Sequence, residues 1–193
     1  MTKYVLIGGY IYKAQDGGKA FCQELVKGIN NKTVKILDCL FARNQDYWDD
    51  RFQDDKKFFS KNLDNFKIEL ALPEKFIDQI KNSDVVFFQG GNPQQLIKIL
   101  ESVGDWNKEL NGKTIVGSSG GADIISKYYG VIKSLSIGEG LGLLSIKFIP
   151  HWKSNYGQRT DEEMELLLEK LKLYKEDLET ITLRDGEFVV IDK

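Results

Sequence analysis

The stretch Ile115-Val116-Gly117-Ser118-Ser119-Gly120-Gly121-Ala122-Asp123 decides how this chain folds, because a strand passes there directly into a helix. Residues 113–116 have the β-branched composition of a buried strand, and residues 122–129 are expected to form a helix. Ser119 has a glycine at both second neighbours. A nucleophile elbow needs small residues there, because strand and helix approach closely around a serine in a strained conformation. We therefore predict a nucleophilic Ser119; an ordinary turn or a phosphate-binding loop is the alternative.

Length and composition predict a single domain over residues 1–193, in which 41% of the residues are hydrophobic and 29% are charged. The net charge of −2 comes from interspersed charges without a basic stripe, which argues against nucleic-acid binding. No run approaches the roughly 18 apolar residues of a membrane span, and the first residues lead into a strand rather than a signal peptide. We therefore expect a cytoplasmic protein in which Cys22 and Cys39 are buried free thiols.

Apolar runs and helical periodicities alternate along the chain. The expected strands are residues 4–7, 33–41, 66–71, 84–88, 113–116, 143–149, 180–183 and 188–191. The expected helices are residues 17–29, 46–62, 73–82, 93–103, 122–129 and a last one that begins at a capping box of Thr160 and Glu163. Residues 130–142 are rich in glycine and are expected to form a loop or short irregular strands, and Asp185-Gly186 predicts a hairpin between the last two strands.

This alternation predicts an α/β protein with a mostly parallel sheet that helices cover on both faces. In such a sheet ligands bind at the carboxyl ends of the strands. Four features directly follow strands: Gly8-Gly9, Gly90-Gly91, the turn at Ser119 and the loop around His151. We therefore expect them to meet at one edge of the sheet.

His151 is the only histidine in the chain, and it follows a strand directly after Pro150. A serine hydroxyl needs a positioned base to take its proton, and near neutral pH this base is usually histidine. We therefore expect His151 to lie beside Ser119 as its general base. One histidine, with no carboxylates at ligand spacing, gives no basis for a metal site, and we expect no cofactor.

The third residue of a catalytic triad is a carboxylate that orients the imidazole. Asp185, Glu187 and Glu139 are the candidates in this sequence. Asp185 is preferred, because it follows a strand and should lie at the same edge of the sheet as Ser119. The alternative is that Asp185 is a plain turn residue of an Asp-Gly pair.

Three motifs in order resemble the peptidase E (aspartyl dipeptidase) and cyanophycinase family: Gln89-Gly90-Gly91-Asn92 after a hydrophobic strand, the turn over residues 117–122, and Pro150-His151-Trp152. The family turn typically reads Gly-x-Ser-Ala-Gly-Ala, and this chain differs in Gly120. The resemblance implies a class I glutamine amidotransferase-like fold, which is a flavodoxin-like three-layer sandwich. It also implies a serine peptidase with Ser119 as nucleophile, His151 as general base, and the amides of Gly91 and Gly120 as oxyanion donors.

The chain departs from the family pattern at the acid. Ser134 stands where peptidase E has an aspartate, whereas cyanophycinase-like members have an acid near the last strands, which matches Asp185 better. The order of nucleophile, histidine and late acid also argues against an α/β-hydrolase, in which the acid precedes the histidine.

The leading hypothesis is a serine exopeptidase that acts on short peptides, including those that begin with aspartate. A desolvated substrate carboxylate needs a paired cation. Arg159 is the preferred candidate, with Asn155 and Asn92 as polar neighbours, and the alternative is that Arg159 pairs with acids of the following helix. The sequence leaves the oligomeric state open between monomer and homodimer.

Two other classes of protein remain as rival hypotheses. Ser134 and Gly120 suggest a binding or regulatory relative that has lost the chemistry. A flavodoxin-like nucleotide binder is the third hypothesis, which the absence of both Gly-x-x-x-x-Gly-Lys-Ser/Thr and Gly-x-Gly-x-x-Gly after the first strand disfavours.

Overall fold

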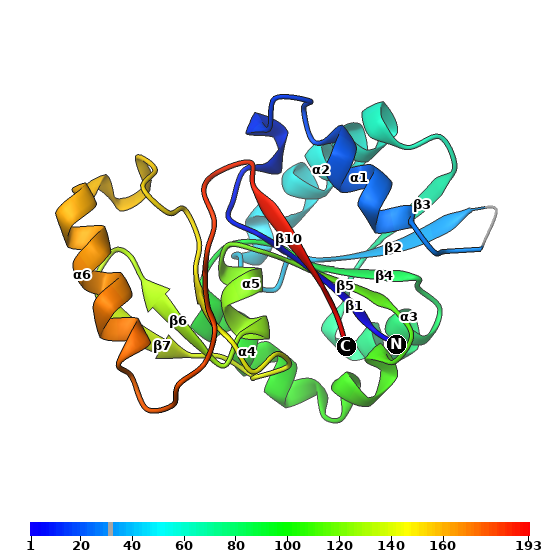
Figure 1. Ribbon diagram of the computed structural model, residues 1–193. Coiled ribbons are helices and arrows are strands. Elements are labelled where there is room, and N and C mark those ends of the chain that lie inside the picture. Colours follow the sequence, from blue (N-terminus) through cyan, green and yellow to red (C-terminus); the bar gives the residue numbers. More distant parts are fainter. Residues whose placement is uncertain (31–32) are drawn as a thin grey trace.

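A six-stranded, mostly parallel sheet forms the centre of the protein in the computed structural model, which describes residues 1–30 and 33–193 (Figure 1). The strands follow the order β10-β1-β5-β4-β2-β3. Their bounds are β1 (Lys3–Ile7), β2 (Val34–Cys39), β3 (Phe66–Leu70), β4 (Val85–Phe88), β5 (Thr114–Ser118) and β10 (Phe188–Asp192). Only β10 is antiparallel to its neighbour, β1, among these pairings.

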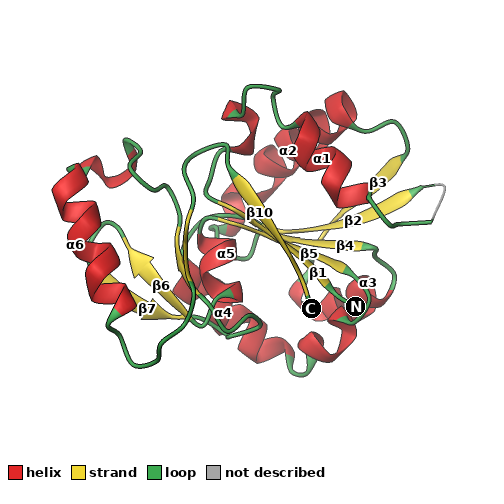
Figure 2. Ribbon diagram, in the orientation of Figure 1, coloured by secondary structure: helices red, strands yellow, loops and turns green. Residues whose placement is uncertain are grey.

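Helices cover both faces of this sheet, as Figure 2 shows. One face carries α1 (Lys19–Val26) and α2 (Trp48–Asn62), and the other carries α3 (Phe76–Lys81), α4 (Pro93–Val103) and α5 (Gly120–Ile125). Successive strand residues point to opposite faces, so β1 contributes Val5 and Ile7 to the first core and Tyr4 and Leu6 to the second. The predicted three-layer α/β fold is therefore confirmed.

A second, four-stranded sheet has the order β7-β6-β8-β9 and lies at the left in Figure 1. Its strands are β6 (Tyr128–Val131), β7 (Ser136–Glu139), β8 (Lys147–Ile149) and β9 (Thr180–Thr182). One of its faces packs against α6 (Asp161–Lys172) through a core of Tyr128, Ile149, Met164, Leu167 and Leu171. Phe148 points the other way and joins the core that lies under α4 and α5.

Two predicted helix starts are confirmed by their caps. Asn92 Oδ1 accepts hydrogen bonds from the amides of Gln94 and Gln95 and caps α4, with Pro93 as first helical residue. Thr160 and Glu163 form the reciprocal capping box of α6. Short 3₁₀ helices are η1 (Ile11–Lys13), η2 (Gln45–Tyr47), η3 (Pro73–Lys75), η4 (Trp106–Leu110) and η5 (Tyr156–Gln158).

The prediction of a helix over residues 122–129 is wrong beyond Ile125. Ser126 is extended, with φ −69° and ψ 163°, and its hydroxyl lies 2.8 Å from the carbonyl oxygen of Asp123, within hydrogen-bond reach. Tyr128 and Tyr129 then begin β6, where both rings are buried. Aromatic residues suit a strand that packs on both faces, and this tertiary burial outweighs the helical pattern.

The prediction of a hairpin at Asp185-Gly186 is also wrong. Strand β9 pairs with β8 in the second sheet, whereas β10 pairs with β1 in the first. The residues between them therefore cross from one sheet to the other. Asp185-Gly186 does form a tight turn, which the bond from the amide of Glu187 to Arg184 O closes at 3.2 Å, and Gly186, with φ 81°, donates its amide to Gly9 O in the turn after β1.

The prediction of a single domain over residues 1–193 stays a prediction. Both cysteines are free and buried, and burial raises the pKa of Cys22 to about 12. Within residues 1–30 and 33–193, no helix is long and apolar enough to cross a membrane.

Candidate active site

Ser119 lies at the turn between β5 and α5 in an unfavourable backbone conformation, with φ 50° and ψ −117°. Its amide donates to Ile7 O at 3.0 Å, so the neighbouring strand fixes the turn. The surrounding glycines are required for space: a Cβ on Gly117 would lie 2.6 Å from Gly121 O, and one on Gly121 would lie 2.0 Å from Phe88 O. Such a conformation is maintained only where its surroundings enforce it, which is typical of functional sites.

His151 follows β8 and is only 4% exposed. Its φ is 50°, and its amide donates to Gly8 O at 2.8 Å. The ring of Tyr156 stacks on the imidazole with centroids 4.1 Å apart and an interplanar angle of 15°. These contacts hold the imidazole so that Nε2 lies 2.8 Å from Ser119 Oγ.

Asp185 lies on the opposite side of the imidazole. Its Oδ1 is 2.6 Å from His151 Nδ1, and its Oδ2 accepts a bond from Lys13 Nζ at 3.2 Å. An ionised carboxylate only accepts, so Nδ1 carries the proton in this arrangement and Nε2 is left to accept from Ser119. Burial lowers the pKa of His151, an effect that the bond to Asp185 opposes. The imidazole is therefore neutral near pH 7.

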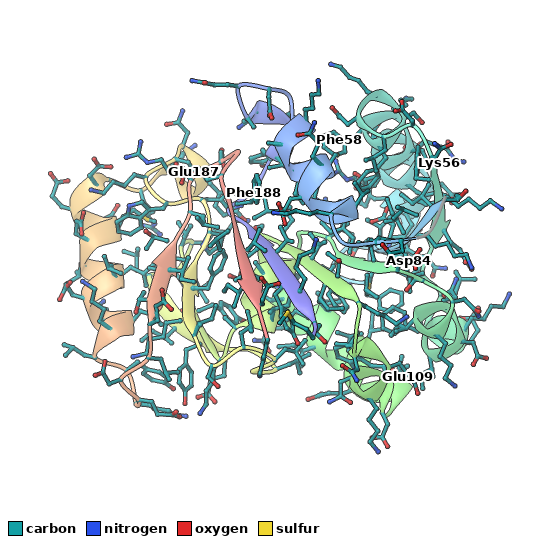
Figure 3. The ribbon with its side chains drawn as sticks, turned by 45° about the vertical axis from the view of Figure 1, so that its right-hand side comes forward. Lys56, Phe58, Asp84, Glu109, Glu187 and Phe188 are labelled. Atoms are coloured by element: carbon teal, nitrogen blue, oxygen red, sulfur yellow. The ribbon has the colours of Figure 1, made fainter. Side chains whose placement is uncertain are left out.

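Backbone carbonyl groups at the end of β1 and in the turn after it accept hydrogen bonds from all three segments that carry the site side chains. Ile7 O accepts from Ser119, Gly8 O accepts from His151, and Gly9 O accepts from Gly186, the residue after Asp185. A Cβ on Gly9 would lie 2.1 Å from the imidazole, so the chain needs glycine to approach His151 this closely. Figure 3 shows Glu187 and Phe188 at the start of β10, where the chain arrives from the second sheet.

The other two candidate acids do not contact the histidine. Glu139 is exposed and accepts bonds from Tyr174 Oη and Lys175 Nζ. Glu187 accepts from the amide of Arg184 within its own loop. Among the candidates, the structure brings Asp185 alone to His151.

Gly91 and Gly120 lie against each other beside Ser119. A Cβ on Gly120 would lie 2.4 Å from Gly91 O and 3.2 Å from Gly91 N, which explains why the chain has glycine at position 120. In the described part of the chain, neither amide donates a hydrogen bond. Both are therefore free to bind a ligand oxygen at the start of α5, where the N–H groups of the first turn have no helical acceptor.

A cavity of about 850 Å³ opens in front of Ser119 and His151. Its wall includes the aromatic rings of Tyr129 and Tyr156, and also Arg43 and Asp123, to which the sequence analysis gave no role. The signals were present, since Arg43 follows β2 closely and Asp123 lies one helical turn after Ser119. Within residues 1–30 and 33–193 there is no cluster of His, Cys, Asp or Glu side chains placed to hold a metal ion.

Of the three predicted substrate-binding residues, one lies in the cavity wall and two do not. Asn92 lines the cavity, although its Oδ1 is used to cap α4. Asn155 and Arg159 are not among the lining residues. Arg159 instead donates to the carbonyls of Ile132 and Lys133 and to Glu163 at the start of α6. The expectation that Arg159 binds a substrate carboxylate is therefore not supported, and the alternative pairing with the following helix is the one observed.

The fold and site describe an α/β protein in which serine, histidine and aspartate form one hydrogen-bonded line at the carboxyl edge of a parallel sheet. The model of peptidase family S51 matches residues 19–193, and the chain therefore belongs to this family of serine-type peptidases. No curated protein sequence matches the chain.

Two solved structures share the fold. A peptidase from an acI-B1 actinobacterium is 18% identical with a TM-score of 0.70, over 99% of this chain and 83% of that one. A protein described as a peptidase E from Listeria monocytogenes EGD-e is 16% identical with a TM-score of 0.71, over 99% of this chain and 94% of that one.

Proposed function

We propose that this serine peptidase is an exopeptidase for short peptides, with Ser119 as nucleophile at a nucleophile elbow, His151 as general base and Asp185 as the acid that orients the imidazole. The observation that carries the proposal is the unbroken line from Ser119 Oγ to His151 Nε2, 2.8 Å, and from His151 Nδ1 to Asp185 Oδ1, 2.6 Å. Both distances lie within the range for proton transfer and for orientation of the base.

In the proposed reaction, His151 takes the proton of Ser119 as Oγ attacks the scissile carbonyl carbon. The carbonyl oxygen becomes an oxyanion, which the amides of Gly91 and Gly120 stabilise by hydrogen bonds. The imidazolium then gives its proton to the departing amine, and the peptide bond breaks to leave an acyl-enzyme. Water, activated by the same histidine, attacks the ester, so that the acid is released and Ser119 regains its proton.

Short peptides fit the cavity better than folded proteins. A volume of about 850 Å³ is in the range of small-ligand sites, and it has room for a few residues. A preference for an N-terminal aspartate would be served by Arg43, which lines the cavity. In the described part of the chain its side chain donates no hydrogen bond, and its Nε is buried without a partner. An unpaired guanidinium suits a carboxylate, which it can bind at two points.

Gly91 connects Arg43 to the reacting atoms. A Cβ on Gly91 would lie 2.3 Å from Ala42 O, and Gln95 fixes this segment by donating to the carbonyls of Phe41 and Arg43. Arg43 directly follows Ala42, whose carbonyl group packs against Gly91, and the amide of Gly91 is one of the two proposed oxyanion donors.

The test combines a fluorophosphonate probe with a library of Xaa-Leu dipeptides. The proposal expects labelling of the wild type, loss of labelling in Ser119→Ala, and hydrolysis of at least one dipeptide. A wild type that is neither labelled nor active would instead support the inactive binding relative.

A further inference from the structure

Asp123 is a buried carboxyl group without a partner in the wall of the same cavity. The residue is 7% exposed, and within the described residues its Oδ1 makes no hydrogen bond. Burial raises the pKa of the Asp123 carboxyl group. A buried polar atom without a partner destabilises the free protein, so its presence needs an explanation in function.

The position of Asp123 relative to the nucleophile is fixed by the helix. The amide of Asp123 donates to Ser119 O at 2.9 Å, which closes the first turn of α5. Asp123 and Ser119 both line the cavity, and the Cα–Cβ bond of a helical residue tilts toward the helix N-terminus, the end at which Ser119 lies. Asp123 therefore faces the space where the acyl group of a substrate must lie.

A cation that reaches Asp123 from this space must be close to the scissile carbonyl carbon. In a peptide cleaved after its first residue, the free α-ammonium is separated from that carbon by Cα alone. A C-terminal carboxylate in the same place would be repelled by the Asp123 carboxylate. The backbone in the interior of a peptide carries no charge at this position.

We propose that Asp123 binds the α-ammonium of the substrate's N-terminal residue and thereby positions the first peptide bond at Ser119. The inference rests on the proposed function, because it takes Ser119 as the nucleophile. The ion pair forms when substrate enters, and it satisfies the oxygen that has no partner in the free protein. Peptides without a free amine leave Asp123 unpaired and are poor substrates.

The first test needs only the wild type. Ala-Leu and Asp-Leu are compared with propionyl-Leu and succinyl-Leu, which are the same molecules without the amino group. We expect kcat/KM to fall about 30-fold or more in the desamino compounds, because one partner of a buried charge pair is missing. Equal hydrolysis of the two sets would overturn the proposal.

The second test uses Asp123→Asn, which keeps the shape and removes the charge. Hydrolysis of the free dipeptides should fall about 30-fold or more, whereas the slow hydrolysis of the desamino compounds should stay within a few-fold. A neutral acid that merely donates a hydrogen bond would be replaced well by the amide, so wild-type activity in this variant contradicts the proposal. Asp105→Asn, at a carboxylate that is 75% exposed and lies outside the cavity lining, is the matched control and should resemble the wild type.

Fluorophosphonate labelling separates the possible failures. If wild type and Asp123→Asn are labelled at the same rate, the variant is folded and its nucleophile works, and the dipeptide rates then judge Asp123 alone. If the wild type is not labelled, the proposed function itself fails. If only the variant is not labelled, the comparison of free and desamino substrates on the wild type decides.

Discussion

Asp185→Asn should be the most informative single change at this site. The wild-type carboxylate accepts two bonds, from His151 Nδ1 at 2.6 Å and from Lys13 Nζ at 3.2 Å. An asparagine side chain has one acceptor oxygen for these two donors. If the oxygen turns to Lys13, the amide NH₂ faces Nδ1 and forces the tautomer with a proton on Nε2. That histidine cannot accept the proton of Ser119.

The expected loss follows from this tautomer. Replacing the orienting aspartate by asparagine in a Ser-His-Asp site typically lowers kcat by roughly 10⁴-fold. Lys13 favours the wrong orientation of the amide, although its side chain is 50% exposed and solvent weakens its pull. We therefore expect a loss of about 10³–10⁴-fold. Removing the competitor should restore part of the activity, so Lys13→Met combined with Asp185→Asn should be faster than Asp185→Asn alone.

The assay is steady-state hydrolysis of the best Xaa-Leu dipeptide, with unfolding temperatures measured alongside. Glu187→Gln is the matched control, since it removes an acid from the same loop that does not contact His151. The reasoning is refuted if Asp185→Asn keeps more than about a tenth of wild-type kcat, a far smaller loss than a mis-set tautomer causes. A double variant no faster than Asp185→Asn would refute the role given to Lys13.

Three further predictions concern the same site. Ser119→Ala and His151→Ala should each abolish most turnover, with the double variant little worse, because such residues act as a unit; additive losses in kcat contradict this. The kcat/KM of the wild type should rise with pH to a half-maximum below 6.5, since burial lowers the pKa of His151 and the deprotonated imidazole is the base; a midpoint above 6.5 contradicts it. Arg43→Met should remove any preference for Asp-Leu over Ala-Leu, measured as the ratio of the two kcat/KM values, whereas Arg159→Met should keep it. The opposite result would assign the substrate carboxylate to Arg159.

The sequence predicted the features that depend on local chemistry. Gly117 and Gly121 predicted a close strand-to-helix turn, and a Cβ at either position would indeed meet backbone atoms. The rule that ligands bind at the carboxyl ends of parallel strands brought His151 to the same edge as Ser119, and the two side chains lie in hydrogen-bond contact. The mostly parallel sheet with helices on both faces could be expected from the alternation of strands and helices.

Features that depend on tertiary partners were not predicted. The sequence does not distinguish Arg159 from Arg43 as a binding residue. Burial and neighbouring acceptors decide which guanidinium stays unpaired, and both depend on the tertiary structure. Asp123 is likewise an ordinary helical residue until the cavity beside it is known. The crossing at Asp185 looked like a hairpin because Asp-Gly favours a tight turn, and nothing local reveals that β9 and β10 belong to different sheets.

That crossing has a consequence for how the newly made chain matures. Strand β1 obtains its second neighbour only when β10 has been synthesised, because Lys3 pairs with Asp192 across almost the whole chain. Contacts between such distant residues form slowly, since a long loop must close before they stabilise anything. Asp185 lies just before β10, so with the proposed role of Asp185 hydrolytic activity should appear only after β10 has paired with β1. A peptidase that matures in this order stays inactive while its own unfolded segments are exposed.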